Sequence, residues 1–380
     1  MNVQRYDMLD ALRGIAALAV VGFHLSQFGM IPAILPRGYL AVDFFFVLSG
    51  FVVAHAYEQA LRTNLSLRSF IVKRIIRLYP LALLGAMSGL LVLLLKWWLF
   101  PGKVDSLGVL LTSGALNLAL VPSFVGASAS SHDIFPGNGP LWSLFFELSI
   151  NLLWAIAGIW LRTSSLITIM LVSLILLALF ASYHDTFNIG YDTKSFWGGL
   201  ARVCFGFPFG VVIYRERHQI RRHARQWGNL VLAAALIGVF AIPIDLLPQS
   251  FPWADILLVS ICLPAIVIFG ISETSGMRAG YLLGNLSYPV YVLHFPVLLI
   301  MSGLGQSVLA GWNIHIIACL GVMAILALAW LAWRFYDEPL RKALTSIVSN
   351  GDKKRHQPQP STELGCGGNQ IDGEQANVRI

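Results

Sequence analysis

The stretch LDALRGIAALAVVGFHLSQ, residues 9–27, is apolar and long enough to cross a membrane, yet it contains Arg13 and His24. A helix needs about 20 residues to cross about 30 Å of hydrocarbon. Similar apolar runs recur along the chain, which has 380 residues, 57% of them hydrophobic and 12% charged. Ordinary soluble domains carry about 25% charged residues. The sequence therefore predicts an all-α, polytopic membrane helix bundle.

We predict ten membrane-spanning helices, at residues 9–26, 39–58, 78–99, 139–161, 165–182, 196–214, 229–247, 255–271, 281–302 and 313–334. A further apolar run, residues 106–121, is marginal. The two strongest basic loops, 62–77 and 214–225, should both be cytoplasmic under the positive-inside rule. If the marginal run crossed, these loops would lie on opposite faces. We therefore expect 106–121 to lie in or re-enter the outer side, with both termini cytoplasmic.

The predicted organisation is one membrane domain, residues 1–345, and a disordered cytoplasmic tail, residues 346–380. From Asn350 onward the chain is too polar to offset its ordering entropy by burial. The first run lacks a small-residue cleavage site after His24, so we interpret it as a retained helix. The net charge of +7 lies mostly in short loops that set orientation, which disfavours a nucleic-acid partner. The four cysteines lie far apart and indicate no metal site.

Arg13 and His24 are expected to share one face of the first helix. They are 11 residues apart, and that spacing ends within about 20° of three full turns, about 16 Å further along the axis. Ionisable side chains inside a span are costly and usually face the bundle interior or a wet cavity, which makes both residues functional candidates. Alternatively, Arg13 only pairs with Asp10 on the same face, and His24 is an interfacial histidine.

Asp43 lies near the start of the second span, in GYLAVDFFFVLSGFVVAHAY. The first helix runs outward and the second returns, so Asp43 and His24 are expected at similar depth. A carboxylate bonded to one imidazole nitrogen fixes the tautomer and raises the basicity of the other, which suits a general base. The alternative is a carboxylate that interacts with amides at the helix start.

The stretch IVKRIIRLYP contains Lys73, Arg74 and Arg77. Guanidinium groups match phosphate oxygens bidentately, so this cluster is a candidate clamp for a phosphorylated ligand. A basic cluster at a cytoplasmic helix end is also typical of a topology anchor or a contact with lipid headgroups.

The stretch GNGPLWSLFFELSINLLW opens the fourth span and contains Trp142, Ser143 and Glu147. Ser143 and Glu147 are four residues apart and share a face, so they are candidates to bind a polyhydroxylated acceptor at the outer side, with Trp142 as an aromatic platform. Alternatively, Trp142 belongs to an interfacial belt and Glu147 is a structural hydrogen-bond partner.

The stretch LSYPVYVLHFPV, residues 286–297, places Tyr291 and His294 three residues apart on the ninth span. These neighbours are candidates to line the same cavity. A proline-kinked helix with satisfied polar side chains explains them as well.

Six stretches in this order, LDALRGIAALAVVGFH, VDFFFVLSGF, RSFIVKRIIRLYP, LWSLFFE, LSYPVYVLHFPV and FYDEPLRK, resemble the acyltransferase-3 family of integral membrane O-acyltransferases. The resemblance covers roughly residues 5–342. Members of that family transfer acyl groups, usually acetyl from acetyl-CoA, to hydroxyls of envelope carbohydrates. The chain resembles the stand-alone form, without a C-terminal hydrolase-like domain.

The resemblance implies roles for individual residues. Arg13 and His24 match the family's signature pair, with His24 the catalytic candidate. Arg74 and Arg77 match a motif associated with the acyl donor, and Asp43 matches an acidic family residue. The chain departs from many members after Glu147, where Leu148, Ser149 and Ile150 replace a second acidic residue and a Phe-Tyr pair.

We therefore expect a multi-pass enzyme of the inner (plasma) membrane that moves an acyl group, typically acetyl from acetyl-CoA, to a carbohydrate or glycolipid. CoA phosphates are expected near Arg74 and Arg77, and His24 is expected to deprotonate the acceptor hydroxyl or to carry the acyl group itself. A proton-coupled transporter that uses Arg13, His24 and Asp43 is the alternative, although no inverted repeat is visible. A catalytically silent scaffold would leave the shared face of Arg13 and His24 unexplained.

Overall fold

The computed structural model describes residues 6–100, 105–125, 132–223, 227–244, 252–272, 278–306, 308–309 and 311–355. Within these ranges the regular structure is helical, and a single isolated antiparallel bridge joins Asp133 to Asp192. The helices are α1 (Asp7–Gln27), η1 (Gly38–Leu40), α2 (Ala41–Thr63), α3 (Leu67–Leu99), α4 (Leu107–Leu118), α5 (Leu141–Ile156), η2 (Gly158–Trp160), α6 (Thr163–Tyr183), α7 (Phe196–His223), α8 (Asn229–Ala241), α9 (Trp253–Leu257), η4 (Leu258–Cys262), α10 (Leu263–Gly270), α11 (Arg278–Gln306), α12 (Ile314–Leu331), η5 (Ala332–Asp337) and α13 (Glu338–Arg355).

The predicted all-α, multi-span architecture is confirmed. Eight helices in the described part of the chain are long and apolar enough to cross a membrane. Helices suit this environment because they satisfy their own backbone hydrogen bonds where water is absent. Two expected spans, 139–161 and 229–247, form shorter helices, Leu141–Ile156 and Asn229–Ala241.

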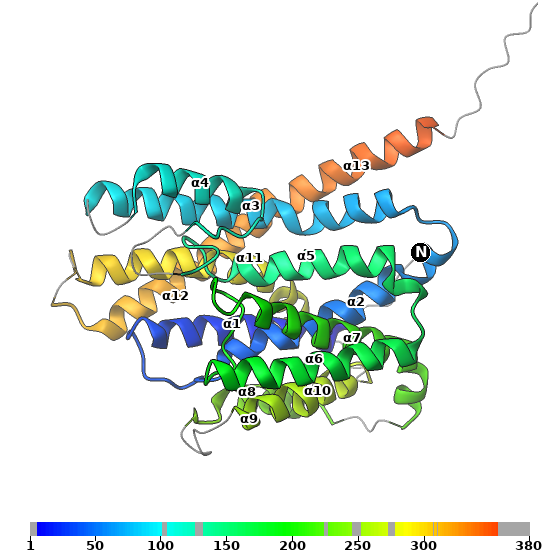
Figure 1. The fold of residues 1–380 in the computed structure, drawn as a ribbon. Coiled ribbons are helices and arrows are strands. Elements are labelled where there is room, and N and C mark those ends of the chain that lie inside the picture. The colour runs from blue at the N-terminus through cyan, green and yellow to red at the C-terminus, as the bar shows by residue number, and fades with distance from the viewer. Residues whose placement is uncertain are drawn as a thin grey trace, which may run out of the picture.

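The marginal run at 106–121 forms α4, a helix of 12 residues. At 1.5 Å per residue it is about 18 Å long, which is too short to cross the hydrocarbon core. It packs beside α3 (Figure 1). Its expected place in or on the outer side of the membrane stays a prediction.

The boundary expected at residue 346 falls inside α13, which continues from α12 through the π-helical turn η5 and extends to Arg355. Figure 1 shows α13 diverging from the other helices. The rest of the expected tail, residues 356–380, lies outside the described residues.

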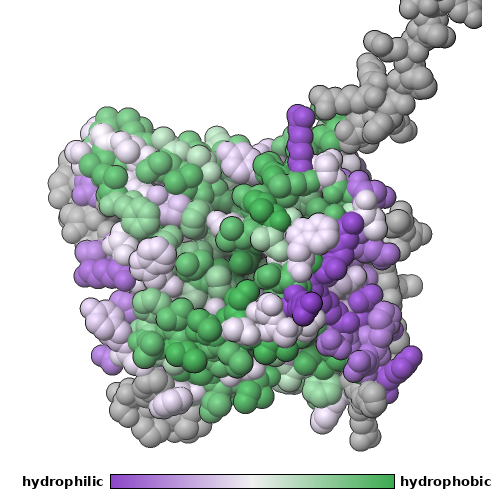
Figure 2. Space-filling view, turned by 45° about the vertical axis from the view of Figure 1, so that its right-hand side comes forward, coloured by the Kyte–Doolittle hydropathy of each residue, from purple (hydrophilic) through white to green (hydrophobic). Residues whose placement is uncertain are grey.

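The bundle has two chemically different ends. Arg62, Arg68 and Lys73 lie near the end of α2 and the start of α3, beside the start of α1 at the right of Figure 1. We call this the basic end, and the opposite end, where α1 ends and α2 begins, the far end. Figure 2 shows hydrophobic side chains over much of the visible wall and hydrophilic ones gathered at the right-hand side. This pattern suits a bundle surrounded by lipid.

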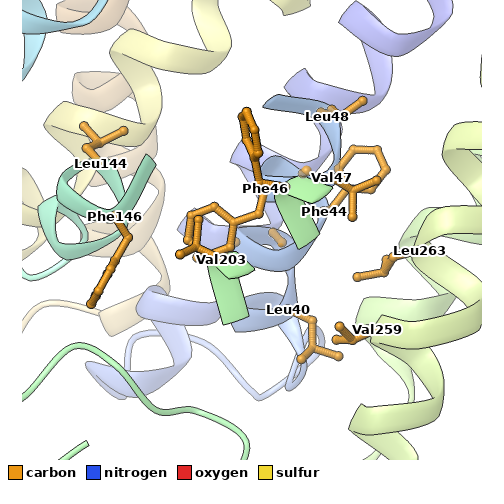
Figure 3. Close-up of a cluster of buried hydrophobic side chains, with 14 of the residues drawn as sticks. Leu40, Phe44, Phe46, Val47, Leu48, Leu144, Phe146, Val203, Val259 and Leu263 are labelled. Carbon is orange, nitrogen blue, oxygen red and sulfur yellow. The ribbon is translucent and has the colours of Figure 1, made fainter. Parts of the chain in front are cut away.

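The core is built around α2. On one side, Leu40 and Phe44 face Val259 and Leu263, and on the other Phe46 lies toward α5, as Figure 3 shows. α2 packs along α7, and α1 packs along α11. These two helix pairs position the side chains of the candidate site.

The crossing of α2 and α7 depends on two glycines. A Cβ at Gly50 would overlap the carbonyl oxygen of Phe207, and a Cβ at Gly210 would overlap that of Val47. Small residues at such crossings let two helix backbones approach closely within a membrane.

Replacing Gly50 with alanine is therefore expected to destabilise the protein by about 1–3 kcal/mol or more, because the obstructing atoms are backbone and cannot rotate away. The melting temperature of the purified protein in detergent measures this effect. Gly238, which has open space around its Cβ position, is the matched control. Equal melting temperatures for Gly50→Ala and Gly238→Ala would contradict the close crossing.

Candidate active site

Two cavities formed by described residues lie inside the bundle. The larger, about 410 Å³, is lined by residues that include Arg13, Arg74, Arg77 and Glu147. The smaller, about 260 Å³, is lined by residues that include His24. We call them the arginine cavity and the histidine cavity. Their linings share Val42 and Tyr291, so one layer of side chains separates them.

Arg13 lies in the arginine cavity and joins α1 to α11. Its guanidinium is 2.9 Å from the Asp10 carboxylate, and it donates to the Ser287 hydroxyl at 2.9 Å and the Gly284 carbonyl at 2.8 Å. The i,i+3 pair with Asp10 that the sequence offered as an alternative is thus formed. The pair also lines the cavity, so its charges reach a ligand there.

Arg74 is buried in the wall of the same cavity. It donates to Glu147 at 3.2 Å, and the same carboxylate oxygen accepts from the Ser49 hydroxyl at 2.8 Å. Arg77 also lines the cavity, whereas Lys73 is exposed and is not part of the lining. The basic cluster therefore divides into two cavity arginines and one surface lysine.

Glu147 differs from its expected position. The sequence placed it with Ser143 at the outer side, near the acceptor. Its carboxylate instead turns toward α3, where the buried cation of Arg74 attracts it. An intramembrane carboxylate is stable only beside such a partner. Glu147 therefore belongs to the arginine cavity.

His24 lines the histidine cavity and contacts His294 of α11 across the helix interface. His24 Nδ1 is 3.1 Å from His294 Nε2 and 3.0 Å from the Val20 carbonyl oxygen. His294 itself is fully buried and is not part of either lining. The two imidazoles thus form a hydrogen-bonded pair, in which His24 lines the histidine cavity and His294 lines neither cavity.

The hydrogen bonds of His294 define the tautomers of this pair. Its Nδ1 lies 2.7 Å from the Tyr291 carbonyl and 3.1 Å from the Val290 carbonyl, which are acceptors, so Nδ1 carries the proton. In the neutral ring, Nε2 is then an acceptor, and His24 Nδ1 must donate to it or to Val20. In this tautomer the lone pair of His24 is on Nε2, and His24 lines the histidine cavity.

Asp43 is not the partner of His24, contrary to the prediction. Its two carboxylate oxygens accept from Arg202 of α7, at 3.0 Å and 2.6 Å, and both side chains are almost fully buried. For a buried carboxylate, a cation is a better partner than a neutral imidazole, because an uncompensated charge is costly away from water. His294 takes the place expected for Asp43 beside His24.

Arg202 was not among the site residues predicted from the sequence. It also donates to the carbonyls of Ile189 and Tyr39, and its guanidinium lies 5.2 Å from the centre of the Trp142 ring. Trp142 in turn lines the histidine cavity. The available signal was an arginine within the predicted span 196–214, which is rare unless it has a buried partner.

The histidine cavity is rich in aromatic and polar side chains at the far end. Besides His24, its lining includes Gln27, Trp142, Asn188 and Tyr191. Burial raises the pKa of the Tyr191 phenol above its usual 10.0, as do the nearby carboxylates of Asp192 and Asp133. Tyr191 therefore stays a neutral hydrogen-bond donor at physiological pH.

The wall between the cavities is held by hydrogen bonds. The hydroxyls of Tyr291 and Ser143 lie 2.7 Å apart, and each lies 3.1 Å from the Pro140 carbonyl oxygen. Since each hydroxyl has one proton, one donates to the Pro140 carbonyl and the other donates to its partner hydroxyl. Ser143 lines the arginine cavity, and Tyr291 lines both. The structure thus joins Ser143 to Tyr291 at the boundary between the cavities, whereas the sequence grouped Ser143 with Glu147 and Tyr291 with His294.

Comparison with known proteins identifies the family of the chain. A family model described as an acyltransferase domain, acyltransferase-3, matches residues 6–334. A protein of Rhizobium radiobacter, named protein 2 in the picA locus, is 37% identical over 186 residues, which cover 47% of this chain and 96% of that protein.

Two longer relatives are named as O-acetyltransferases. A putative peptidoglycan O-acetyltransferase of Bacillus subtilis is 25% identical over 369 residues, covering 88% of this chain and 54% of the relative. A peptidoglycan O-acetyltransferase of Listeria monocytogenes is 25% identical over 368 residues, with coverages of 88% and 55%. The chain thus spans about half the length of these two relatives. No solved structure matches it.

The family match extends over most of the chain, and it includes the helices that line both cavities. The chain therefore belongs to the acyltransferase-3 family, as a polytopic membrane protein whose bundle is an acyltransferase domain.

Proposed function

We propose that this protein is a membrane O-acyltransferase that moves an acetyl group from acetyl-CoA to a carbohydrate hydroxyl, as the names of its longer relatives suggest. The observation that carries the proposal is the pair of cavities that meet at Tyr291 beside His24. The lining of one cavity includes three arginines, and that of the other is rich in aromatic and polar groups. Such a pair suits a phosphorylated donor and a sugar acceptor.

The donor enters from the basic end, which is the cytoplasmic end under the positive-inside rule. Its phosphates lie near Arg13 and Arg77, and its pantetheine arm runs along α1. Arg13 and His24 are 11 residues apart, about 16 Å along the helix axis, which is comparable to an extended pantetheine arm. The thioester then reaches the wall at Tyr291.

The acceptor sugar occupies the histidine cavity, with Trp142 as a stacking surface and Gln27, Asn188 and Tyr191 as hydrogen-bonding groups. Sugar rings present apolar faces to aromatic side chains and hydroxyls to polar ones. The opening of this cavity at the far end faces the outside of the cell. We place the protein in the plasma membrane of a bacterium, since both O-acetyltransferase relatives are bacterial proteins.

The chemistry follows from the tautomer of His24. Its Nε2 accepts the proton of the sugar hydroxyl while the sugar oxygen bonds to the acetyl carbon. The carbon–sulfur bond then breaks, and the imidazolium returns the proton to the CoA thiolate. His294 accepts or shares the Nδ1 hydrogen and so stabilises the ring as it becomes charged. The Tyr291 side chain moves aside for the thioester to meet the hydroxyl.

The direct test uses purified protein in nanodiscs with radiolabelled acetyl-CoA and envelope glycans. Transfer of label to the glycan supports the function, and a glycan without label in the presence of folded, donor-binding protein would contradict it. Membranes that contain the His24→Ala variant provide the background.

Replacing Arg77 with alanine is expected to weaken acetyl-CoA binding about tenfold or more, because a charge-assisted hydrogen bond contributes about 1.5–3 kcal/mol. Arg77 is preferable to Arg74, whose loss would leave Glu147 without its cation. The apparent KM for acetyl-CoA measures the effect, and kcat should change little. Lys73→Ala is the charge-matched control, since Lys73 is outside the cavity. Equal KM values for both variants would remove Arg77 from the donor site.

A further inference from the structure

The proposed donor carries more negative charge than the arginine cavity can neutralise. Arg13 and Arg74 each contact a carboxylate, Asp10 and Glu147. Among the described residues, Arg77 is the cavity arginine for which no carboxylate lies within ion-pair distance. CoA has a diphosphate and a 3′-phosphate, and a phosphate monoester alone carries about −1.5 to −2 charges at pH 7. Further cations are therefore needed beyond the cavity.

Such cations lie at the basic end of the cavity, beside its lining residues Tyr6 and His55, which we call the mouth. Arg217 and Arg221 of α7 are the charged groups that act on the Tyr6 hydroxyl, and Tyr6 lines the cavity. Burial raises the pKa of Tyr6, whereas these two guanidinium groups lower it. Tyr214, Arg217 and Arg221 follow each other at i, i+3 and i+7, so they share one face of α7.

The same mouth has an aromatic surface. The Tyr6 ring packs against His55 at 5.3 Å between ring centres, and both residues line the cavity. His55 also contacts Tyr214 at 5.8 Å, and the Arg217 guanidinium lies 4.0 Å above the Tyr214 ring. Aromatic rings can stack on nucleobases. Arginines beside them can bind phosphate oxygens through charge-assisted hydrogen bonds.

Distances along helix α1 can be compared with the length of the donor. Tyr6 lies 18 residues before His24, about 27 Å along the axis, and Arg13 lies about 16 Å from it. The interval of about 10 Å between Arg13 and Tyr6 accommodates the adenosine part of CoA once the pantetheine arm fills the deeper part. Both the charge and the length of the donor thus extend to the mouth.

We propose that Tyr6, His55, Arg217 and Arg221 form a subsite for the adenosine 3′-phosphate of the donor, distinct from the arginines of the cavity. This subsite rests on the proposed use of CoA. Its consequence is that the protein distinguishes CoA from 3′-dephospho-CoA at the basic end, far from the reacting atoms.

Three probes test the subsite by calorimetric binding to the full chain in nanodiscs: CoA, 3′-dephospho-CoA and 4′-phosphopantetheine. Wild type is expected to bind CoA at least tenfold more tightly than 3′-dephospho-CoA. The variant Arg217→Gln with Arg221→Gln should lose this preference yet bind 4′-phosphopantetheine like wild type, which also shows that it is folded. Arg222→Gln, an exposed arginine of the same helix end, should keep the preference.

Two results would overturn the subsite alone: equal wild-type affinity for CoA and 3′-dephospho-CoA, or a preference that persists in the double variant. Absence of binding for all three probes would overturn the CoA donor itself and the subsite with it.

Discussion

The variant His24→Ala is expected to lose acyl transfer by about 10² to 10⁴-fold, the usual contribution of a general base. His24 lines the proposed acceptor cavity and carries its lone pair on Nε2, whereas alanine offers no group that could take the hydroxyl proton. Initial rates with radiolabelled acetyl-CoA and an envelope glycan measure the loss. Retained transfer would remove His24 from the chemistry.

Two companion variants separate chemistry from folding. His315→Ala changes an exposed histidine at the start of α12 and should leave the rate unchanged. His294→Ala should slow transfer less than His24→Ala, since the Val20 carbonyl still accepts the His24 Nδ1 hydrogen. It should also shift the pH profile of kcat, because His294 no longer stabilises the charged ring. A pH profile identical to that of wild type would contradict a positioning role for His294.

The variant Arg202→Met is expected to lose about 3–5 kcal/mol of stability, because it leaves the buried Asp43 carboxylate without a cation. It also removes the hydrogen bonds that join α7 to the carbonyls of Ile189 and Tyr39. Thermal unfolding in detergent and the yield of folded protein measure the effect. Both side chains are almost fully buried, so solvent cannot replace the lost cation.

Two further variants serve as controls. Arg334→Met removes an exposed ion pair with Glu338 and should change stability by at most about 1 kcal/mol. Adding Asp43→Leu to Arg202→Met removes the uncompensated charge and should recover part of the lost stability. A melting temperature for Arg202→Met equal to that of Arg334→Met would show that the buried pair does not support the fold.

The sequence alone predicted the class of the protein and most of its helices. Runs of about 20 apolar residues can satisfy their backbone only as helices in lipid, so spans such as 9–26 and 165–182 were predictable without any partner. The six ordered motifs also resemble the acyltransferase-3 family, and the family match confirms that resemblance. Two expected spans form the shorter helices α5 and α8. The residues after each of these helices are also apolar, so hydrophobicity alone did not show where the helices end.

The contacts of the site were decided by tertiary structure. His24 and His294 are 270 residues apart, and Asp43 and Arg202 are 159 apart. Helical periodicity gives the face on which each side chain lies, but not which neighbouring helix meets that face or at what rotation. The packing of α1 on α11 and of α2 on α7 sets both, through glycines such as Gly50 and Gly210. Sequence thus determined which residues sit in the membrane, and helix packing decided their partners, because a buried charge or imidazole takes the partner that the crossing brings within reach.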